Sequence, residues 1–305
     1  MTEQQPVFAF GLIALVLLTI FPLVDSAFVP STRTFHPSES ESALRIRMTN
    51  WCMEATPNMV PKAEVACTAH ICPTPELTPE IYAKWRESKL GNLTESIERG
   101  LMLELVGDDL TGKSILEIGC GDGNLVVELS KATHGLGKMT AVDASNAMIE
   151  AAKSRASEHR AEVTFSAAIA QDLPFDDMQF DLVVAQTILC FIKDPLPVFR
   201  EISRVLRPGG TIVIGELGKW STWALERRLK AMRGSSLWKK GVFRTAEELK
   251  GLALSAGLLP SRISGAVYYP RYLPLARLLS PYDHIFSRIS TVGAAFLAMK
   301  ASKPA

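Results

Sequence analysis

The sequence of 305 residues has few cysteines, no long run of charge and too little Gly or Pro for a fibrous repeat. None of its five cysteines belongs to a C-x-x-C pair. They are Cys52, Cys67, Cys72, Cys120 and Cys190. An odd set without paired spacing indicates neither a disulfide framework nor a zinc finger, so we assign no metal site. No run of Lys or Arg is long enough to indicate binding of nucleic acid.

The composition is that of a globular protein, with 47% hydrophobic and 21% charged residues. The length fits one large α/β domain with appendages or two small domains. Residues 215–305 hold 15 Lys or Arg against 5 Asp or Glu, whereas residues 1–214 hold 18 against 27. The basic C-terminal third is either a solvated face or a surface for an anionic substrate or membrane.

Residues 7–24 form 18 consecutive positions without a charge. This length is typical of both a secretory signal and a membrane-spanning helix, and both interpretations stay open. No Lys or Arg precedes the segment, and the nearest cation, Arg33, follows it. If residues 1–27 are a retained anchor, this charge bias places the rest of the chain on the cytoplasmic side.

The apolar segment is followed by residues 25–30, DSAFVP. This stretch resembles the cleavage motif of bipartite presequences in algae with secondary plastids, and we favour cleavage after Ala27 and a plastid location over a membrane anchor. The stretch from Pro30 to Pro79 contains seven prolines, these two included. We therefore expect residues 28–78 to be a transit peptide and linker, largely disordered. Cys67, His70 and Cys72 lie there, and we expect them to have no metal or redox role.

A short apolar run, residues 114–117, leads into a glycine-rich turn with the sequence IGCGDG at residues 118–123. An amphipathic helix is predicted over residues 124–132. A second apolar run at residues 139–142 ends at Asp143. Glycines allow a sharp turn and close approach of a ligand, and a carboxylate at the end of the next strand can accept hydrogen bonds from a ribose diol. The pattern predicts a site for a nucleotide-like molecule.

The glycine spacing discriminates between nucleotides. The dinucleotide fingerprint G-x-G-x-x-G requires a third glycine at position 124, which is Asn124, so a nicotinamide-dependent oxidoreductase is a weaker alternative. Glu117 instead opens the pattern E-x-G-x-G-x-G, which resembles motif I of the class I S-adenosylmethionine-dependent methyltransferases.

Later segments follow in the order of the same family. Strands are predicted at residues 163–166, 180–184 and 211–215, and a helix over residues 198–206 ends at the sequence RPGG. The series resembles the type 11, ubiquinone-biosynthesis-like methyltransferase domain. The resemblance implies an α/β, Rossmann-like fold: an open, mostly parallel seven-stranded sheet with helices on both faces. It places the cofactor-binding core at residues 79–216, and cap helices with the last two strands at residues 217–305.

The resemblance implies S-adenosylmethionine as the cofactor and assigns its contacts. The backbone of Gly119 and Gly121 passes beneath the cofactor, Glu117 holds its methionine end, and Asp143 binds the ribose. An aromatic pair, Tyr82 and Trp85, is expected over it. The full set is Tyr82, Glu117, Gly119, Cys120, Gly121, Asp143, Ala144, Met148, Ala170, Gln171 and Gln186.

One position departs from the family pattern. Ile169 stands where relatives often carry an Asp that accepts a hydrogen bond from the adenine amine. Loss of one neutral hydrogen bond costs about 0.5 to 1.5 kcal/mol, so binding is expected to weaken but persist. The backbone at Ala170 or the side chain of Gln171 can substitute. The departure also motivates an alternative, a catalytically silent module that binds S-adenosylmethionine.

Methyl transfer needs positioning more than acid or base chemistry, so no catalytic residue is assigned. Residues 185–190, AQTILC, lack the motif of amino-directed nucleic-acid methyltransferases. We expect a small acceptor, lipophilic or anionic and quinol- or lipid-like, and a small buried role for Cys190.

The acceptor site is expected in the C-terminal part. Residues 218–240 mix tryptophans with cations and can lie on a membrane surface, cover a pocket or dock on the sheet. After a helix over residues 246–256, strands near 263–268 and 294–300 flank an insertion expected to be a loop or lid. The predicted substrate contacts are Trp220, Tyr268, Tyr269, Tyr272, Asp283 and His284. Membrane association is expected through residues 7–24 or through this basic region.

Overall fold

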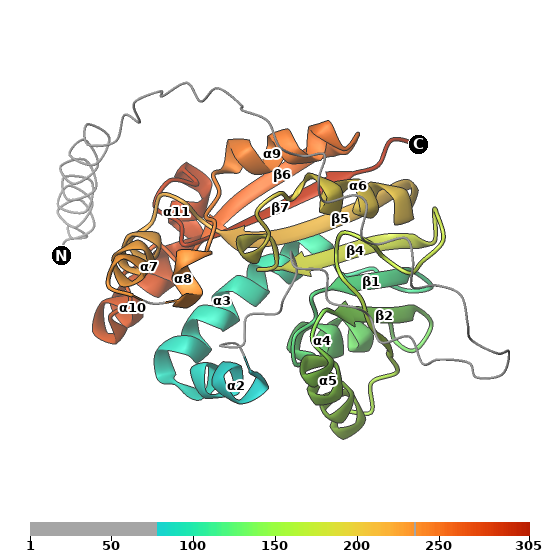
Figure 1. The fold of residues 1–305 in the computed structure, drawn as a ribbon, viewed down its shortest axis with the longest axis horizontal. Helices are drawn as coiled ribbons and strands as arrows, with labels where there is room; N and C mark the ends of the chain where they lie inside the picture. The colour runs from blue at the N-terminus through green and yellow to red at the C-terminus, as the bar shows by residue number, and fades with distance from the viewer. Residues whose placement is uncertain (1–77, 235) are drawn as a thin grey trace, which may run out of the picture. The chain divides into compact units, whose positions relative to one another are not determined.

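The computed structural model describes residues 78–234 and 236–305. Within this part the chain forms one seven-stranded sheet. The strands are β1 (Ser114–Ile118), β2 (Lys138–Asp143), β3 (Thr164–Ala167), β4 (Phe180–Gln186), β5 (Leu206–Leu217), β6 (Leu259–Ala266) and β7 (Phe296–Ser302). They lie in the order β3-β2-β1-β4-β5-β7-β6 (Figure 1). The predictions for residues 1–77, including the leader, the cleavage site and Cys67 with Cys72, lie outside the described residues.

All strand pairs from β3 to β5 are parallel, and only β7 runs antiparallel to its neighbours β5 and β6. Parallel strands bring their carboxyl ends to one edge of a sheet, where ligands bind in open α/β folds. The predicted fold is confirmed. It places the ends of β1, β2 and β4 next to one another.

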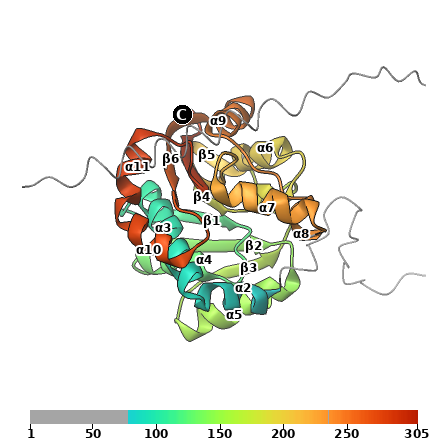
Figure 2. The same ribbon diagram turned by 90° about the vertical axis from the view of Figure 1, so that its left-hand side faces the viewer.

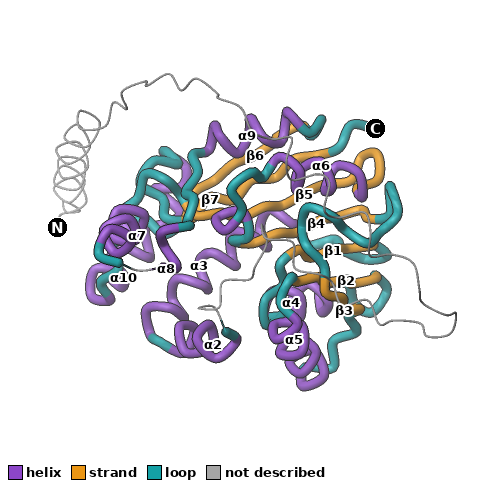
Figure 3. The backbone as a smooth tube through the Cα atoms, viewed as in Figure 1, coloured by secondary structure: helices purple, strands orange, loops and turns teal. Residues whose placement is uncertain are grey.

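Helices cover both faces of the sheet (Figure 3). In the described part they are α2 (Pro79–Glu87), α3 (Lys89–Val106), α4 (Asn124–Ala132), α5 (Asn146–Glu158), α6 (Leu196–Val205), α7 (Thr222–Met232), α8 (Ser236–Lys239), α9 (Ala246–Ser255), α10 (Leu273–Leu279) and α11 (Asp283–Ile289), with 3-10 turns η2 (Leu189–Phe191) and η3 (Ser280–Tyr282).

Neighbouring residues of β1 show why two layers of helices are needed. Ile115 packs in a buried cluster with residues of α3, α4 and α5, while Leu116 packs in a second cluster with residues of α6 and α9. Side chains alternate between the faces of a strand, so an apolar strand must be covered on both sides. The turn after β1 is therefore held between two packed layers.

Strand β5 is longer than predicted. It begins at Leu206 and includes the sequence RPGG, which was predicted to lie between the helix and a strand beginning at residue 211. The backbone of Gly209 donates to the carbonyl of Lys303, and the backbone of Lys303 donates to the carbonyl of Gly210. This pairing with the C-terminal end of the chain is remote in sequence, so the local pattern does not reveal it.

The insertion after β6 is helical and not the predicted loop. It forms α10, η3 and α11, and β6 ends at Ala266. The Asp283 carboxylate accepts hydrogen bonds from the backbone of Val267 and Tyr268, each at 2.9 Å. These bonds anchor the start of α11 to the end of β6. Among the described residues, no helix combines the length and the apolar character needed to cross a membrane.

Candidate functional site

The turn after β1 depends on its glycines, two of which line the cavity described below. Gly119 and Gly121 have φ angles of 71° and 54°, in the left-handed region that most side chains avoid. A Cβ on Gly119 would lie 2.1 Å from Cγ2 of Ile188, whereas a Cβ on Gly121 would meet no atom within 4 Å. The turn therefore packs on one side against the loop after β4 and faces open space on the other.

Asp143 at the end of β2 is bonded to this turn. Its Oδ2 accepts from the backbone N–H of Gly121 at 2.9 Å, and its Oδ1 accepts from the backbone N–H of Ser145 at 2.8 Å. Burial raises the pKa of this carboxyl, and the backbone hydrogen bonds oppose the rise. The carboxylate is thus held in a fixed orientation beside the glycine turn, with acceptor capacity left for a ligand.

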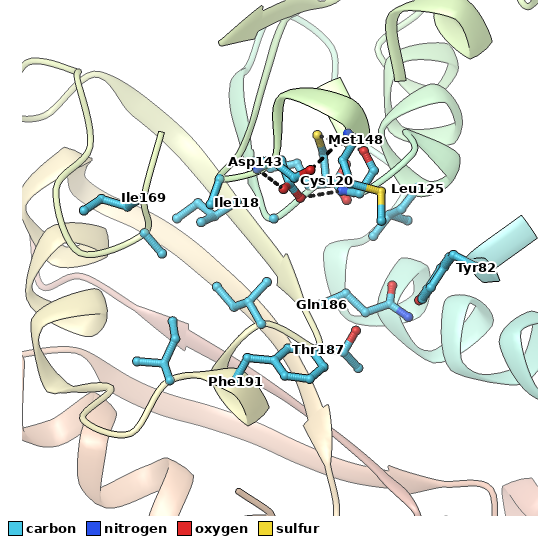
Figure 4. Close-up of a pocket in the computed structure, with 18 of the residues that line it drawn as sticks. Tyr82, Ile118, Cys120, Leu125, Asp143, Met148, Ile169, Gln186, Thr187 and Phe191 are labelled. Atoms are coloured by element: carbon cyan, nitrogen blue, oxygen red, sulfur yellow. Dashed lines mark hydrogen bonds between the residues drawn. The ribbon is translucent and has the colours of Figure 1, made fainter. Parts of the chain in front are cut away.

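The turn and Asp143 open onto a cavity of about 1040 Å³ (Figure 4). The cavity runs along the carboxyl ends of β1, β2 and β4. With the exception of Trp85, the residues predicted to lie at the cofactor line this cavity: Tyr82, Glu117, Gly119, Cys120, Gly121, Asp143, Ala144, Met148, Ala170, Gln171 and Gln186. Ile169 also lines the cavity. The arrangement suits one extended ligand.

Helix α2 closes one end of the cavity through Tyr82. The side chain of Tyr82 lies near that of Thr187, just beyond β4. Burial, followed by the charges of Glu95 and Glu98, raises the pKa of this hydroxyl, so it stays protonated. Figure 4 shows Tyr82, Gln186 and Thr187 gathered at this end.

A buried ion-pair cluster attaches α2 to the glycine turn. Arg86 of α2 donates to Oδ1 of Asp122 at 2.6 Å and also pairs with Oδ2. Arg155 of α5 donates to Oδ2 of Asp122 at 2.9 Å and to its backbone carbonyl. Because Asp122 belongs to the turn and is only 4% exposed, these contacts position α2 and α5 around the cavity. Sequence analysis missed Arg86, although it follows Tyr82 by one helical turn.

The comparisons with known proteins agree with this geometry. Residues 116–214 match a family model described as a methyltransferase domain. The chain is an S-adenosylmethionine-dependent methyltransferase with the class I fold, and S-adenosylmethionine is its cofactor.

Individual relatives are more distant. The methyltransferase is 29% identical to an uncharacterised protein of Mycobacterium bovis over 72% of this chain and 70% of that protein. It is 40% identical to a demethylmenaquinone methyltransferase of Lactococcus lactis over 34% of this chain and 42% of that enzyme. A solved structure of a geranyl diphosphate methyltransferase with geranyl diphosphate and sinefungin is similar in fold, with a TM-score of 0.53 and 20% identity over 71% of this chain and 80% of that one.

The cavity of the methyltransferase fits its cofactor at two atoms. In the described part of the chain, Oε2 of Glu117 and Oε1 of Gln171 are buried without a hydrogen-bond partner. A buried acceptor without a donor is costly, so both atoms favour a ligand that carries donors. An ammonium group at Glu117 and an adenine amine at Gln171 would supply them. Gln171 can therefore accept the hydrogen bond from the adenine amine that an Asp at position 169 would otherwise accept.

The protonation of Glu117 follows from its surroundings. The residue is 2% exposed, and burial followed by the charge of Asp143 raises its pKa well above the usual value. A bound cation would favour the ionised carboxylate and lower the pKa again. Binding of the cofactor's ammonium group is therefore expected to release a proton from Glu117 when the free carboxyl is protonated.

The rest of the cavity wall was not predicted. Its apolar side is formed by Phe191, Ile192 and Val242, and cations from two segments stand beside it, Lys193 after η2 and Lys239 with Lys240 at the end of α8. The backbone of Val242 donates to the carbonyl of Cys190 at 2.9 Å, which joins the two segments. No local pattern marks this contact between residues about 50 positions apart in sequence.

Three further aromatic residues are placed differently from the predictions. Trp85 does not line the cavity; its ring packs edge-on against Trp223, with centroids 6.1 Å apart. Tyr269 is fully buried, with its hydroxyl 3.2 Å from that of Thr94. Tyr268 donates its hydroxyl to the carbonyl of Ser290. These residues stabilise the packing of the C-terminal part.

The predicted substrate contacts therefore need correction. Six described residues predicted to contact the substrate do not line the cavity: Trp220, Tyr268, Tyr269, Tyr272, Asp283 and His284. For the five residues after β6, the reason is that the insertion folds as helices against α3 and β6 and not over the cavity. Trp220 lies before α7 and is likewise absent from the cavity lining. The prediction for Cys190 is confirmed, because it is completely buried and burial raises the pKa of its thiol.

Proposed function

We propose that the methyltransferase acts on a small, lipophilic acceptor that carries an anionic or acidic group, of quinol- or lipid-like chemistry. The proposal rests on the composition of the cavity wall that lies away from the cofactor-binding residues. Its apolar part, Phe191, Ile192 and Val242, suits a hydrocarbon or aromatic body, and the lysines beside it suit an anion.

When bound, S-adenosylmethionine would supply an electrophilic methyl carbon that an acceptor nucleophile can attack in line with the C–S bond, so that the sulfur leaves as a neutral thioether. The chain's own task is to position the acceptor and to exclude water. Tyr82 and Thr187 stand at one end of the cavity, and Arg86 holds α2 in place through Asp122. Positioning of this kind can remove about 7 to 11 kcal/mol from a reaction barrier.

Two relatives support the acceptor class. The demethylmenaquinone methyltransferase is named for a quinone, and the geranyl diphosphate methyltransferase was solved with a molecule that joins an apolar chain to a diphosphate. The quinone and geranyl diphosphate each combine an apolar body with polar groups. The two sides of the cavity wall in this methyltransferase offer the same combination.

The test is a transfer assay with methyl-labelled S-adenosylmethionine, the full chain, and either a demethylated quinol, geranyl diphosphate or a total lipid extract. We expect the labelled methyl group in the quinol or lipid, which is recovered in the organic phase, or in geranyl diphosphate. If the protein binds the cofactor but labels only hydrophilic, cationic acceptors, the proposed acceptor class is wrong.

Variants at the mouth of the cavity locate the anion. The double change Lys239→Gln and Lys240→Gln is expected to raise the KM for an anionic acceptor several-fold and to leave the affinity for S-adenosylmethionine unchanged. Lys131→Gln, on the exposed side of α4, is the matched control. An equal KM in all three proteins would argue against an anionic group at this end.

A further inference from the structure

Exposed apolar side chains gather on two helices of the C-terminal part. On α7 they are Leu225, Leu229 and Met232, which are spaced by four and three residues and so share one side of the helix. On α10 and η3 they are Leu275, Leu278 and Tyr282, spaced by three and four residues. Met232 is 83% exposed and Leu278 is 63% exposed. We call these six residues the α7–α10 face.

The two helices lie at the same end of the molecule. Figure 1 shows α7 and α10 next to each other at the left, and in Figure 2, where this end faces the viewer, both are in front. Contacts near their N-termini agree with these views. Arg271, just before α10, pairs with Glu226 of α7 at 3.4 Å, and the indole of Trp223 donates to the carbonyl of Tyr269 at 2.6 Å.

The charges around the face are mostly positive. Three exposed arginines lie on or beside these helices: Arg233 follows α7, Arg277 lies within α10 and Arg288 lies within α11. The acidic residues of these helices do not offset them. Glu226 is paired with both Lys230 and Arg271, and Asp283 is buried with its carboxylate bonded to backbone N–H groups. The surroundings of the face therefore favour an anionic partner.

We propose that the α7–α10 face binds the surface of an anionic lipid bilayer. Helices that present apolar side chains beside cations insert into the boundary between headgroups and acyl chains, and polybasic segments are attracted to anionic lipids. Both features are present here. The face serves contact with a membrane surface and is separate from any role of residues 7–24.

The position of the face agrees with a membrane-derived substrate. Helix α8 follows α7 directly, and Lys239 with Lys240 at its end line the cavity. A bilayer held against α7 would therefore lie near the mouth of the cavity. Only this link depends on the proposed acceptor class, since the binding of vesicles can be measured without any acceptor.

Hydrogen–deuterium exchange of the full chain tests the proposal. The probes are vesicles of phosphatidylcholine alone and vesicles with about one third phosphatidylserine. We expect anionic vesicles to slow exchange in peptides from α7 and α10 while peptides from α4 and α5 stay unchanged. Slowed exchange confined to residues 1–77, or no change in α7 and α10, would overturn the proposal.

Substitutions separate the face from the rest of the chain. Leu229→Glu with Met232→Glu is expected to lower partitioning onto anionic vesicles by roughly tenfold, because two apolar groups are lost and two negative charges added. Leu136→Glu with Met178→Glu is the control, since these residues are also exposed and lie on loops outside α7 and α10. Equal partitioning of both variants would contradict the assignment of the face.

The charges are tested separately. Arg233→Gln and Arg277→Gln are each expected to reduce binding to anionic vesicles by about fivefold at low salt and to weaken its salt dependence. Affinity for S-adenosylmethionine, measured in the same preparations, should not change and shows that each variant is folded. Binding to neutral and anionic vesicles with equal affinity would exclude the electrostatic part of the proposal.

Discussion

The cofactor-binding core and the C-terminal part of this methyltransferase use similar residue types for different ends. In the core, the aromatic Tyr82 and the carboxylates Glu117 and Asp143 line the cavity. In the C-terminal part, Trp223 and Tyr269 are buried and hydrogen-bonded to other parts of the chain. The comparison teaches that an aromatic or polar residue is informative about a ligand only when its place relative to the strand ends is known.

Removal of a large side chain from the C-terminal part should affect stability and not cofactor binding. Trp223→Ala is expected to lower the free energy of unfolding by about 3 to 5 kcal/mol, because Trp223 is 2% exposed and contacts Trp85 and Tyr269. Denaturant unfolding with and without S-adenosylmethionine measures it. Trp223→Phe is the milder control. A folded variant with lost cofactor affinity would break the comparison.

The opposite pattern is expected in the core. Asp143→Ala removes a carboxylate that would accept two hydrogen bonds from a ribose, which at about 1.5 kcal/mol or more each corresponds to roughly a hundredfold weaker binding of S-adenosylmethionine. Calorimetric titration gives the affinity. Asp176→Ala, at an exposed position outside the cavity, should bind as the unchanged protein does. Unchanged affinity in Asp143→Ala would contradict the ribose assignment.

Glu216 at the end of β5 lies between the two regions and links stability to pH. Burial raises its pKa to about 7, while the backbone hydrogen bond from Leu189 opposes the rise. Between pH 5 and 7 the folded state therefore binds more protons than the unfolded state, and stability falls as pH rises.

The measurable effect is a difference between two proteins. Glu216→Gln should lose this dependence, so that the change in unfolding free energy between pH 5 and 7 is smaller by roughly 2 kcal/mol than in the unchanged protein. Thermal and denaturant unfolding at both pH values give the comparison. Parallel curves for the two proteins would show that Glu216 titrates normally.

The smallest effect is expected at Gln171. Gln171→Leu keeps the size of the side chain but removes the amide oxygen, and a lost neutral hydrogen bond costs about 1 kcal/mol, or about fivefold in affinity for S-adenosylmethionine. Gln179→Leu, at an exposed site outside the cavity, is the control. If the two variants bind alike, Gln171 does not compensate for Ile169.

Much of the core was predictable from local patterns. The helix expected over residues 124–132 is α4 with the same bounds, and the strand expected to end at Asp143 is β2. The apolar runs and the glycine turn are short-range signals that the chain obeys locally. The insertion after β6 was expected to be a loop or lid because of its length, whereas Pro274 and Pro281 lie in the first turns of α10 and η3.

By itself, the sequence determined the nature of the cofactor site. Strands that alternate with helices form a parallel sheet, and a parallel sheet brings the residues after β1, β2 and β4 to one edge regardless of how the rest of the chain packs. Gly119, Gly121 and Asp143 meet for that reason.

Only the tertiary structure decided which part of the C-terminal region faces the cavity. That choice depends on contacts between remote residues, such as Tyr269 with Thr94, which are 175 positions apart, and Val242 with Cys190. Such contacts are set by the complementary shapes of side chains in the folded core, and short-range periodicity carries no information about them.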